Sequence, residues 1–511
     1  MRKALLNDKF LIAAIIISIL YMSCCFLLYN YSFQGFERIF FDIGIETYNM
    51  YWHLHGALYT NPFQFQFIVF ANHISPFFVL ILPLFALDQN AMTLVFIQDM
   101  FLAATSVVAY LTGRQLIKND RIAFYFFILF LFSPGISALA VYDFHAEAFV
   151  PMFVILSFYF YTKGKIKYFV MSYLLLLMTI EVAYFLGAAL LLGLLAYEIQ
   201  YKKYGVEPDA LRVRRRHILY AGFIMTIATA IAYYAISGQI SASYAGVSYY
   251  KLTPYLRLAN YVSGQINAIA NPSIVNTTIS QTYPAGLAGV TILVLQFGGA
   301  SLFSPISTLL LLSPWLGEVF IVHNLSFTGI LYQYYGFFAG NCFVAAILGY
   351  LVVYRRSDHR SRYPSLKERI LAKLPSTIMI IGITIFLYTD LIIFGYLLSG
   401  EPAANSASLS LAIAAIPQNA VVMTQSTLST HMANFYQLEM PPTESLRWFE
   451  PRNASNTDLF WAQPQYILID KNTYDYTQAF NTTQFNVYSY MRSNYTEIYN
   501  SSGVYLYEIK R

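Results

Sequence analysis

The sequence predicts an α-helical polytopic membrane protein with about 11 transmembrane helices and a small C-terminal external α/β domain. Of its 511 residues, 57% are apolar and only 11% are charged, a balance that a soluble domain of this length cannot bury. The apolar residues form continuous runs rather than the alternation typical of a β-barrel. Composition therefore excludes a soluble enzyme, a disordered chain, a collagen and a small disulfide-rich protein.

The first transmembrane helix is expected directly after the basic N-terminus. The apolar run that starts at Phe10 is about 20 residues long, which is enough to cross a bilayer. No cleavage motif follows the run, so it is typical of a signal anchor whose N-terminus stays in the cytoplasm. Further long apolar runs lie near residues 92–112, 122–141, 146–162, 218–236, 331–353 and 375–398.

Two apolar stretches, residues 168–200 and 286–320, are too long for one span and short for two. If each is a hairpin of two short spans, 22 of the 31 Lys and Arg residues lie in loops on the cytoplasmic side. A single span in either place would turn a basic loop such as 212–217 (RVRRRH) outward, against the positive-inside rule. The hairpin plan predicts a multi-pass plasma-membrane protein with a cytoplasmic N-terminus. The basic loops then set topology and do not bind nucleic acid.

Glycosylation sequons test this plan independently, because a glycan can be attached only on the external side. Seven sequons occur, at Asn30, Asn276, Asn324, Asn453, Asn481, Asn494 and Asn500. All of them fall on segments that the charge distribution assigns to the outside, which supports the plan modestly.

Residues 1–398 form the predicted transmembrane domain, and residues 399–511 form a separate extracellular domain. The net charge changes from +8 in the first part to −3 in the second, and the long apolar runs stop. Three segments are typical of short strands: AVVMT (420–424), QYILID (465–470) and VYLYEIK (504–510). NSSG (500–503) before the last of them predicts a hairpin turn.

The first external loop, residues 30–91, is predicted to carry interfacial helices. Its centre, FDIGIETYNMYWHLHG (41–56), would form an amphipathic helix whose apolar face lies on the outer leaflet. One face of that helix would carry a polar stripe made of Asp42, Glu46, Asn49 and His53. The plain alternative is a solvated polar face. Two acids within one turn repel each other, however, unless a cation or a metal lies close by.

A second short helix is expected over residues 77–87, because FFVLILPLFAL is apolar but too short to span. It follows the segment ANHISP (71–76), which contains the candidate residue His73. A lone histidine is more often structural than a ligand. Arg38 and His73 are nevertheless the groups of this loop that could offset the charge of a phosphate.

The segment VYDFHAEAF (141–149) lies where the third span leaves the membrane and the fourth begins. If it is helical, Asp143 and Glu147 share one face, and His145 points elsewhere. These carboxylates could simply be solvated. Because the loop lies on the same side as the 41–56 helix, Asp42 could instead meet Asp143 and hold a divalent cation such as Mg²⁺ or Mn²⁺.

Three further acids lie in or near predicted spans: Asp99, Glu181 and Asp390. An acid in hydrocarbon costs several kcal/mol and usually faces a cavity or a partner. Glu181 is expected at the outward hinge of the 168–200 hairpin, where it could face the same external cavity. The motifs of a nucleotide-binding P-loop, a zinc protease and a serine hydrolase are absent from the sequence.

The elements FDIG (41–44), HISP (73–76) and YDFHAE (142–147), with Glu181, resemble the archaeal and bacterial membrane-protein family called domain of unknown function 2079. YDFHAE is the most specific of these elements. At Glu181 only the acid of the family's lysine–glutamate–aspartate element is retained. The tail segments 421–435 and 464–470 are also similar to the family's external domain.

This family is similar in plan to the GT-C class of glycosyltransferases, in which a catalytic aspartate lies in the first external loop and a second acid in the next. The resemblance implies Asp42 and Asp143 at these places, and a polyprenyl-phosphate sugar as donor. Enzymes of the class differ in whether they need a metal, so a metal does not follow from the resemblance.

The resulting hypothesis is a glycosyltransferase acting on the external face, with a glycan, a lipid or a protein as acceptor. Asp42 would be the general base. Asp143 or Glu147 would hold a cation or orient the acceptor, and the expected substrate-binding residues are Glu46, His53, His73, His145, Glu181 and Arg38. Two alternatives remain at this point. One is a transporter or flippase that uses Asp99, Glu181 and Asp390, and the other is a non-catalytic subunit that binds an envelope partner.

Overall fold

The computed structural model describes most of the transmembrane domain and the central part of the C-terminal domain. The described residues are 8–36, 41–55, 75–180, 182–202, 209–243, 272–321, 334–357, 366–398, 402–433, 437–439, 463–473, 491 and 494–510.

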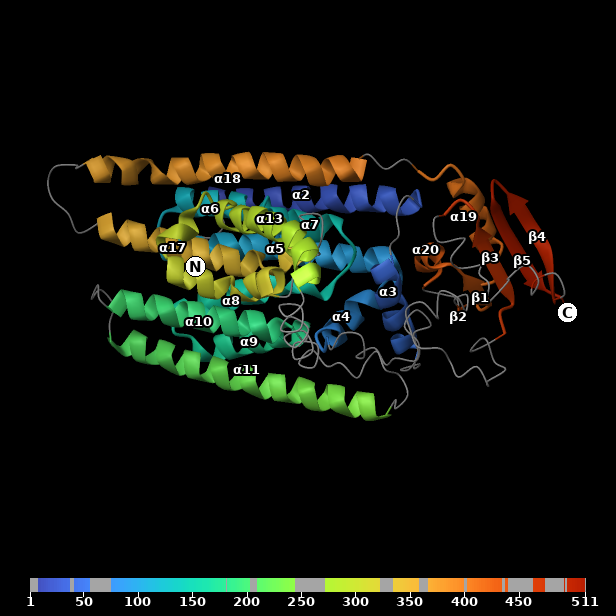
Figure 1. The fold of residues 1–511 in the computed structure, drawn as a ribbon, viewed down its shortest axis with the longest axis horizontal. Coiled ribbons are helices and arrows are strands. Elements are labelled where there is room, and N and C mark those ends of the chain that lie inside the picture. Colours follow the sequence, from blue (N-terminus) through green and yellow to red (C-terminus); the bar gives the residue numbers. More distant parts are fainter. Residues whose placement is uncertain are drawn as a thin grey trace.

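Most of the described residues up to position 398 are helical (Figure 1). In chain order the helical elements are α2 (Lys9–Gln34), α3 (Phe41–Leu54), α4 (Phe78–Phe85), α5 (Ala91–Ile117), α6 (Asp120–Leu131), α7 (Pro134–Val141), η2 (Ala146–Phe149), α8 (Val150–Thr162), α9 (Ile166–Thr179), α10 (Ala183–Lys202), α11 (Asp209–Ser243), α13 (Pro272–Leu295), η4 (Ala300–Phe303), α14 (Pro305–Leu311), α15 (Ser313–Leu316), η5 (Gly317–Ile321), α16 (Tyr334–Phe337), α17 (Ala339–Ser357) and α18 (Leu366–Leu398).

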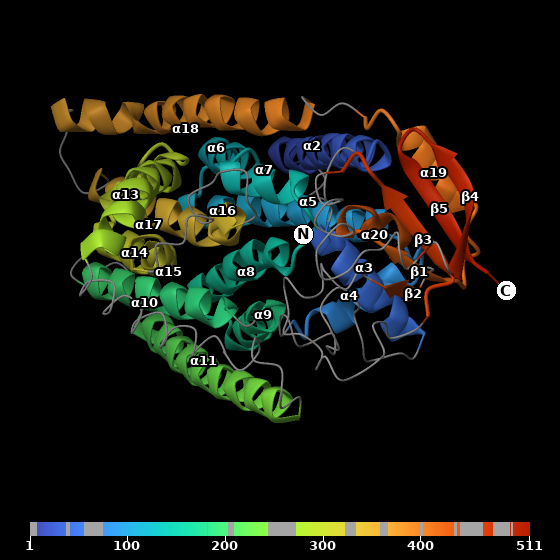
Figure 2. The ribbon, with the colours of Figure 1, turned by 45° about the vertical axis from the view of Figure 1, so that its right-hand side comes forward.

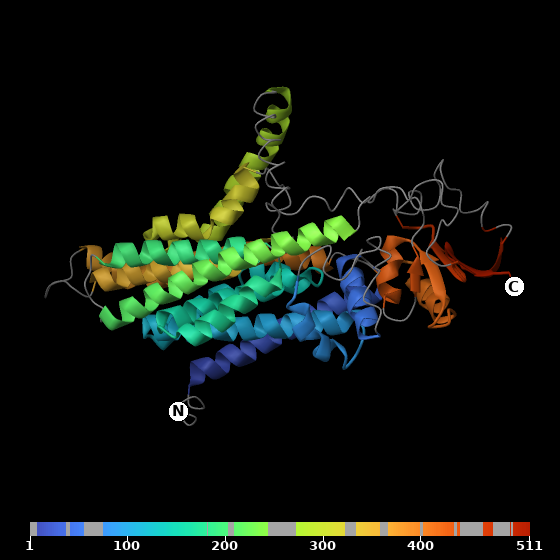
Figure 3. The same cartoon turned by 90° about the horizontal axis from the view of Figure 1, so that it is seen from below.

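Most of the long helices run along one direction, α13 is steeply inclined to them, and the C-terminal domain lies at one end of the bundle (Figures 1 and 3). Among the described residues, four helical segments are long and apolar enough to cross a membrane: Lys9–Gln34, Ala91–Ile117, Val213–Tyr233 and Ser376–Gly395. The pair α6 and α7 adds a fifth if it forms one span, bent by 46° at a break before Pro134. Proline at the start of α7 explains the break, because its ring cannot continue the preceding helix. The count of about 11 spans stays a prediction.

Both stretches of ambiguous length contain a break between two helices. Residues 168–200 divide into α9 and α10 at Ile180–Val182, and residues 286–320 turn at Gly298 and Gly299. Both glycines have positive φ angles, 62° and 72°, which L side chains rarely adopt. The hairpin interpretation of the sequence therefore agrees with the positions of the helix ends.

Segments that the charge pattern assigns to the cytoplasmic side meet at the end of the bundle away from the C-terminal domain. Arg114 binds both Asp8, at 2.6 Å, and Asp120, at 2.9 Å. Arg215 is buried and binds Glu198 at 3.2 Å. These ion pairs connect α2, α5 and α6 in one place, and α10 with α11 in another. Each of them lies beside a basic segment, and the side of the membrane on which these segments lie stays a prediction.

The C-terminal domain contains a five-stranded sheet with the order β2-β1-β3-β5-β4. Its elements are α19 (Ser406–Ala414), β1 (Val421–Thr424), α20 (Ser426–Ser429), η7 (Thr430–Met432), β2 (Gln437–Glu439), β3 (Tyr466–Asp470), β4 (Tyr495–Ser501) and β5 (Val504–Ile509). β2, β1 and β3 are parallel, whereas β5 pairs antiparallel with both β3 and β4. The three predicted strands and the hairpin turn are all present, and Ser502 and Gly503 take the positive φ angles that a tight hairpin requires.

Helix α3 lies between the helical bundle and the C-terminal domain (Figure 2). Ile43 and Met50 belong to the core of the bundle, whereas Ile45 and Tyr48 pack into the core of the C-terminal domain. The prediction that the apolar face of this helix lies on the outer leaflet is therefore wrong. Protein covers that face, because the C-terminal domain folds back onto it.

The C-terminal domain also holds the end of α2. The Ala403 N–H donates to the Gly35 carbonyl at 2.8 Å. His431 stacks between Phe33 and Phe36, with ring centroids 4.3 and 4.0 Å away, and burial lowers the pKa of its imidazole to about 3. A neutral, stacked His431 thus contributes packing rather than charge.

Gly44 is where α3 and η7 approach most closely. A Cβ atom added there would lie 2.5 Å from Thr430 Oγ1 and 3.1 Å from the Thr430 Cα atom. We expect Gly44→Ala to destabilise the protein by about 1–3 kcal/mol, because overpacking forces the two elements apart. Thermal unfolding of the purified protein measures this. Gly395→Ala is the matched control, since nothing lies within 4 Å of the added Cβ there; equal melting of the two variants would contradict the prediction.

Candidate active site

Asp42 lies in the first turn of α3, at the end of the bundle that carries the C-terminal domain. The free N–H groups and the dipole at the start of a helix stabilise a carboxylate there. Its side chain is 49% exposed, so the carboxylate is open to a substrate. This is the position at which the sequence predicts the general base.

The YDFHAE segment is not an α-helix. Residues 142–145 are extended, and η2, a short 3-10 helix, follows them at Ala146–Phe149. The inference that Asp143 and Glu147 share a helix face while His145 points elsewhere is therefore wrong. The extended backbone turns His145 toward Asp42, with 3.2 Å between His145 Nε2 and Asp42 Oδ2.

Asp143 is buried and joins three segments of the chain. Its Oδ1 accepts a hydrogen bond from the Tyr29 hydroxyl of α2 at 2.5 Å. Its Oδ2 accepts from the Ile43 N–H at 3.2 Å, one of the N–H groups that the start of α3 leaves without a helical partner. Asp143 thus fixes the start of α3, and with it the position of Asp42.

Hydrogen bonds on both sides hold the His145 imidazole. His145 Nδ1 lies 2.9 Å from the backbone carbonyl of Asp143, and Nε2 faces the Asp42 carboxylate. A doubly protonated imidazolium, which donates from both nitrogens, satisfies both acceptors. Gln98 of α5 fixes the backbone here, because its Oε1 accepts from the His145 N–H at 3.0 Å and its Nε2 donates to the Leu139 carbonyl at 2.7 Å.

The pKa values of the two central groups follow from burial and from their neighbours. Burial and the charge of Asp42 raise the pKa of Asp143 from 3.8 to about 7, although His145 and the hydrogen bonds from Tyr29 and Ile43 oppose the shift. Burial alone would lower the pKa of His145. The hydrogen bond and the charge of Asp42, with Glu147 and Asp143, outweigh burial and raise it from 6.5 to about 10. At neutral pH the site therefore holds an imidazolium that faces the Asp42 side chain.

These shifts predict a pH dependence of stability. A group whose pKa rises on folding contributes its full stabilisation when the pH is below its pKa in the unfolded chain. That contribution disappears as the pH rises through its pKa in the folded protein. The contribution of Asp143 is then lost between about pH 4 and 7, and that of His145 between about pH 6.5 and 10. We expect the melting temperature of His145→Gln to fall less steeply than that of the unmodified protein above pH 7. Parallel curves over that range would contradict this expectation.

Mg²⁺ or Mn²⁺ at Asp42 and Asp143 stays a prediction. Asp42 faces an imidazolium, and both oxygens of Asp143 already accept hydrogen bonds. In the part of the chain that the structure describes, no three His, Cys, Asp or Glu side chains are placed to hold a metal. The His145 imidazolium supplies positive charge beside the Asp42 carboxylate.

The polar stripe of α3 is present and half-buried. Glu46, Asn49 and His53 follow Asp42 along the helix as predicted, and each is partly exposed. His53 Nδ1 is buried without a hydrogen-bond partner among the described residues. A substrate group at this nitrogen would satisfy it, so Glu46 and His53 remain candidate binding residues.

Three predicted site residues, Arg38, His73 and Glu181, lie outside the described residues. The structure does bring neighbouring residues of two of them together. The Phe77 N–H donates to the Met178 carbonyl at 3.0 Å, which joins the end of HISP to the end of α9.

Of the glycosylation candidates, Asn494 and Asn500 are exposed on the C-terminal domain, Asn276 lies in α13 and Asn30 in α2. Asn324, Asn453 and Asn481 are outside the described residues.

Asp99 and Asp390 are away from this site, inside the bundle. Asp390 accepts from Ser137 at 3.1 Å and from Tyr21 at 3.2 Å. Both oxygens of Asp99 are buried without a partner among the described residues. These groups line the inside of α2, α5, α7 and α18, and they do not take part in the arrangement around Asp42.

Sequence reasoning missed Tyr29 and Gln98. Tyr29 lies in an apolar run, and as one of 44 tyrosines it carries no distinguishing pattern. Gln98 could have been found, because an amide next to an acid inside a span is rare and usually has a partner within the bundle.

Comparisons with known proteins agree with the architecture. The family described as "Predicted membrane protein (DUF2079)" matches residues 39–506. No curated protein matches the chain. The structure is similar to ArnT from Cupriavidus metallidurans bound to undecaprenyl phosphate, with 9% identity, a TM-score of 0.52, and coverage of 96% of this chain and 97% of that one. It is also similar to the apo form of the Archaeoglobus fulgidus oligosaccharyltransferase, with 9% identity, a TM-score of 0.47, and coverage of 99% and 75%. The first similarity shows a GT-C-like fold, which agrees with the fold class that the sequence predicts.

Proposed function

The chain belongs to the DUF2079 family of predicted membrane proteins, and from its GT-C-like fold and the site around Asp42 we propose that it is a membrane-embedded glycosyltransferase. It transfers a sugar from a polyprenyl-phosphate donor to an acceptor on the external face, where the C-terminal domain lies. The ArnT structure of the same fold contains undecaprenyl phosphate, which supports a donor of this class.

The observation that carries the proposal is the pairing of Asp42 with His145. These two residues lie 103 positions apart in the sequence, yet their side chains are 3.2 Å apart at the start of α3. A carboxylate at a helix start is stabilised there in any protein, but here it is also half-exposed and paired with a largely buried imidazolium from a distant segment. It is typical of a preorganised catalytic group. The pairing also disfavours the non-catalytic alternative, which expects Asp42 and Asp143 far apart on solvated surface.

In the proposed reaction, Asp42 accepts the proton of an acceptor hydroxyl as its oxygen attacks the anomeric carbon of the donor sugar. The bond between that carbon and the phosphate oxygen breaks, and its electron pair leaves with the polyprenyl phosphate. His145 keeps Asp42 ionised and oriented before the proton transfer. It also offers positive charge close to the leaving phosphate, a role that the sequence assigns as well to Arg38 and His73.

Asp143 acts on the reaction through position and not through direct contact. Its hydrogen bonds to Tyr29 and Ile43 hold the start of α3 against α2. Glu147 contributes to the negative charge around the imidazolium and helps to keep it protonated. The acceptor is a glycan, a lipid or a protein, and Glu46 and His53 are the residues that would bind it along α3.

Transport of a lipid or a polar solute is the second candidate, because the structure places ionisable groups inside the bundle. Asp390, Tyr21 and Ser137 form one hydrogen-bonded cluster, and Asp99 is buried in the neighbouring helix α5. Buried acids of this kind occur in proton and substrate pathways. They do not explain the exposed Asp42 and its partner, so we place transport second.

The test is turnover of the donor by purified full-length protein. We expect the protein, incubated with a panel of polyprenyl-phosphate sugars and with glycan, lipid and protein acceptors, to release polyprenyl phosphate and to form a glycosylated product. Mass spectrometry detects both products. Absence of release with every donor in the panel would overturn the proposal.

A further inference from the structure

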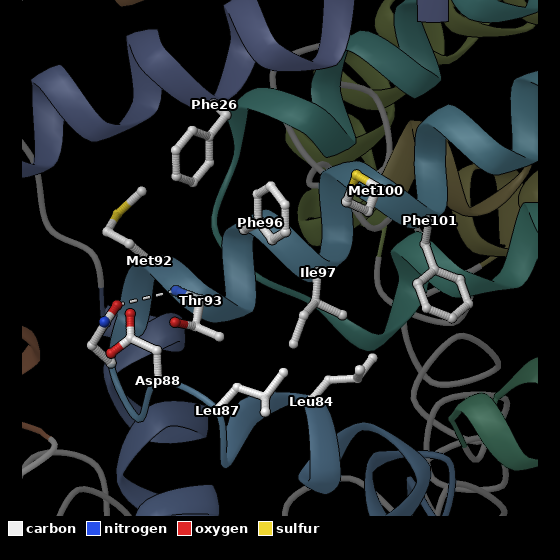
Figure 4. Close-up of a pocket in the computed structure, with 11 residues that line it drawn as sticks. Phe26, Leu84, Leu87, Asp88, Met92, Thr93, Phe96, Ile97, Met100 and Phe101 are labelled. Atoms are coloured by element: carbon white, nitrogen blue, oxygen red, sulfur yellow. Dashed lines mark hydrogen bonds between the residues drawn. The ribbon is translucent and has the colours of Figure 1, made fainter. Parts of the chain in front are cut away.

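A groove opens on the lipid-facing side of the bundle between α2, α4 and α5 (Figure 4). Its volume is about 520 Å³, within the range of roughly 300–1,000 Å³ that small-molecule sites occupy. Its lining includes Phe26, Leu84, Asp88, Thr93, Phe96 and Met100. It is separate from Asp42 and His145, which do not line it.

The wall of the groove is apolar and exposed on the outside of the bundle. Phe96 and Met100 of α5 are 52% and 51% exposed, and Leu84 of α4 is 45% exposed. Phe26 of α2 closes one side, with its ring 5.8 Å from that of Phe96 in an edge-to-face contact. Large apolar side chains exposed around a concavity at membrane depth are the surface that an alkyl or isoprenoid chain covers.

The groove runs along α5 from a polar mouth. Asp88 and Asn90 lie just before α5, and Thr93 is in its first turn (Figure 4). Met100 lies seven residues after Thr93, a distance of roughly 10 Å at 1.5 Å per residue. This length is about a third of the thickness of a hydrocarbon core, which is roughly 30 Å. The groove is therefore long enough to hold the part of a single lipid chain that lies nearest to the head group of the lipid.

The charge at the mouth decides which lipid fits. Among the residues that the structure describes, the lining includes an exposed carboxylate, Asp88, and contains no Lys or Arg. A carboxylate repels the terminal phosphate of a polyprenyl phosphate and attracts an ammonium group. The polar side chains beside it, Asn90 and Thr93, suit hydrogen bonds and do not change the charge.

We propose that this groove is a binding site for a membrane lipid with an ammonium in its head group, held by Asp88, and that it is distinct from the site of the anionic donor. The chain of the lipid lies along Phe96 and Met100, and its head group lies beside the start of α5. Helices α4 and α5 both contact α3, so the bound lipid lies next to the helix that carries Asp42. The site stands on its own observations and does not depend on the proposed transfer reaction.

The experiment uses purified full-length protein in dodecyl maltoside, an uncharged detergent, with a phosphatidylethanolamine that carries a diazirine in its acyl chain. After illumination, mass spectrometry locates the label. We expect it on residues 84–101 and near Phe26. Unlabelled phosphatidylethanolamine should compete, whereas phosphatidic acid and polyprenyl phosphate should not.

Two variants test the parts of the site separately. Asp88→Lys should reduce labelling by phosphatidylethanolamine about two- to fivefold, the size typical of an exposed ion pair, and make phosphatidic acid an effective competitor. Met100→Trp should fill the groove and remove the label. The matched control is Leu20→Trp, on a 65% exposed position of α2 outside the groove, which should keep the label.

Stronger competition by polyprenyl phosphate than by phosphatidylethanolamine would overturn the proposal and assign the groove to the donor chain. The proposal would also be overturned if the label were spread over other exposed helices, or if Asp88→Lys did not change the amount of label. Asp42→Asn should label like the unmodified protein. Loss of transfer activity with intact labelling therefore separates a failure of the proposed reaction from a failure of this site.

Discussion

Asp42→Asn is expected to lower the rate of sugar transfer by about 10²–10⁴-fold, the range that a positioned general base contributes. The amide keeps the size of the side chain but cannot accept the acceptor's proton. It also removes the negative charge that keeps His145 protonated. The measurement is the initial rate of product formation at a saturating concentration of the donor that the purified protein uses.

Stability provides the control for this variant. The Asp42 side chain is half-exposed, so Asp42→Asn should still fold, but it should lose the part of the stability above about pH 6.5 that its pair with His145 contributes, and rates are compared at a temperature where both proteins are folded. Asp42→Glu should retain more activity than Asp42→Asn, since it keeps a carboxylate at the start of α3. Full activity of Asp42→Asn with every acceptor would exclude Asp42 as the base.

Asp143→Ala is expected to destabilise the protein by about 2–4 kcal/mol, because each buried donor left without a partner costs roughly 1–3 kcal/mol. The two donors are the Tyr29 hydroxyl and the Ile43 N–H, and the Asp143 carboxylate is their common acceptor. Thermal or denaturant unfolding in detergent measures the loss.

Asp143→Asn separates position from charge, since its amide oxygen still accepts one of these hydrogen bonds. We expect it to be less destabilised than Asp143→Ala and to keep part of the activity. If Asp143→Ala melted like the unmodified protein, Asp143 would not hold the start of α3. If Asp143→Asn were as inactive as Asp42→Asn at unchanged stability, Asp143 would act directly on the substrate.

Local patterns predicted much of the fold. The helical periodicity of residues 41–54 predicts α3, and β-branched and aromatic runs predict β1, β3 and β5. Loop charge predicts the helix breaks near Ile180 and Gly298, because only two short helices keep the basic loops on one side. Each of these signals lies in a short stretch of the sequence.

The remaining features depend on contacts between distant segments. Residues 142–145 are extended because Gln98 and the start of α3 bind their backbone and side chains, and no local pattern encodes those partners. For the same reason His145 was expected to point away from the acids. The burial of Tyr48 and Ile45 could be predicted only by knowing that the C-terminal domain folds back onto α3.

Transfer at Asp42 is tested most directly by a structure of the protein with a non-cleavable phosphonate analogue of the polyprenyl-phosphate sugar that it turns over. We predict that the sugar lies at the start of α3, with its anomeric carbon facing Asp42 and its phosphonate close to His145. A sugar bound inside the bundle beside Asp99 and Asp390 would contradict transfer at Asp42 and favour transport.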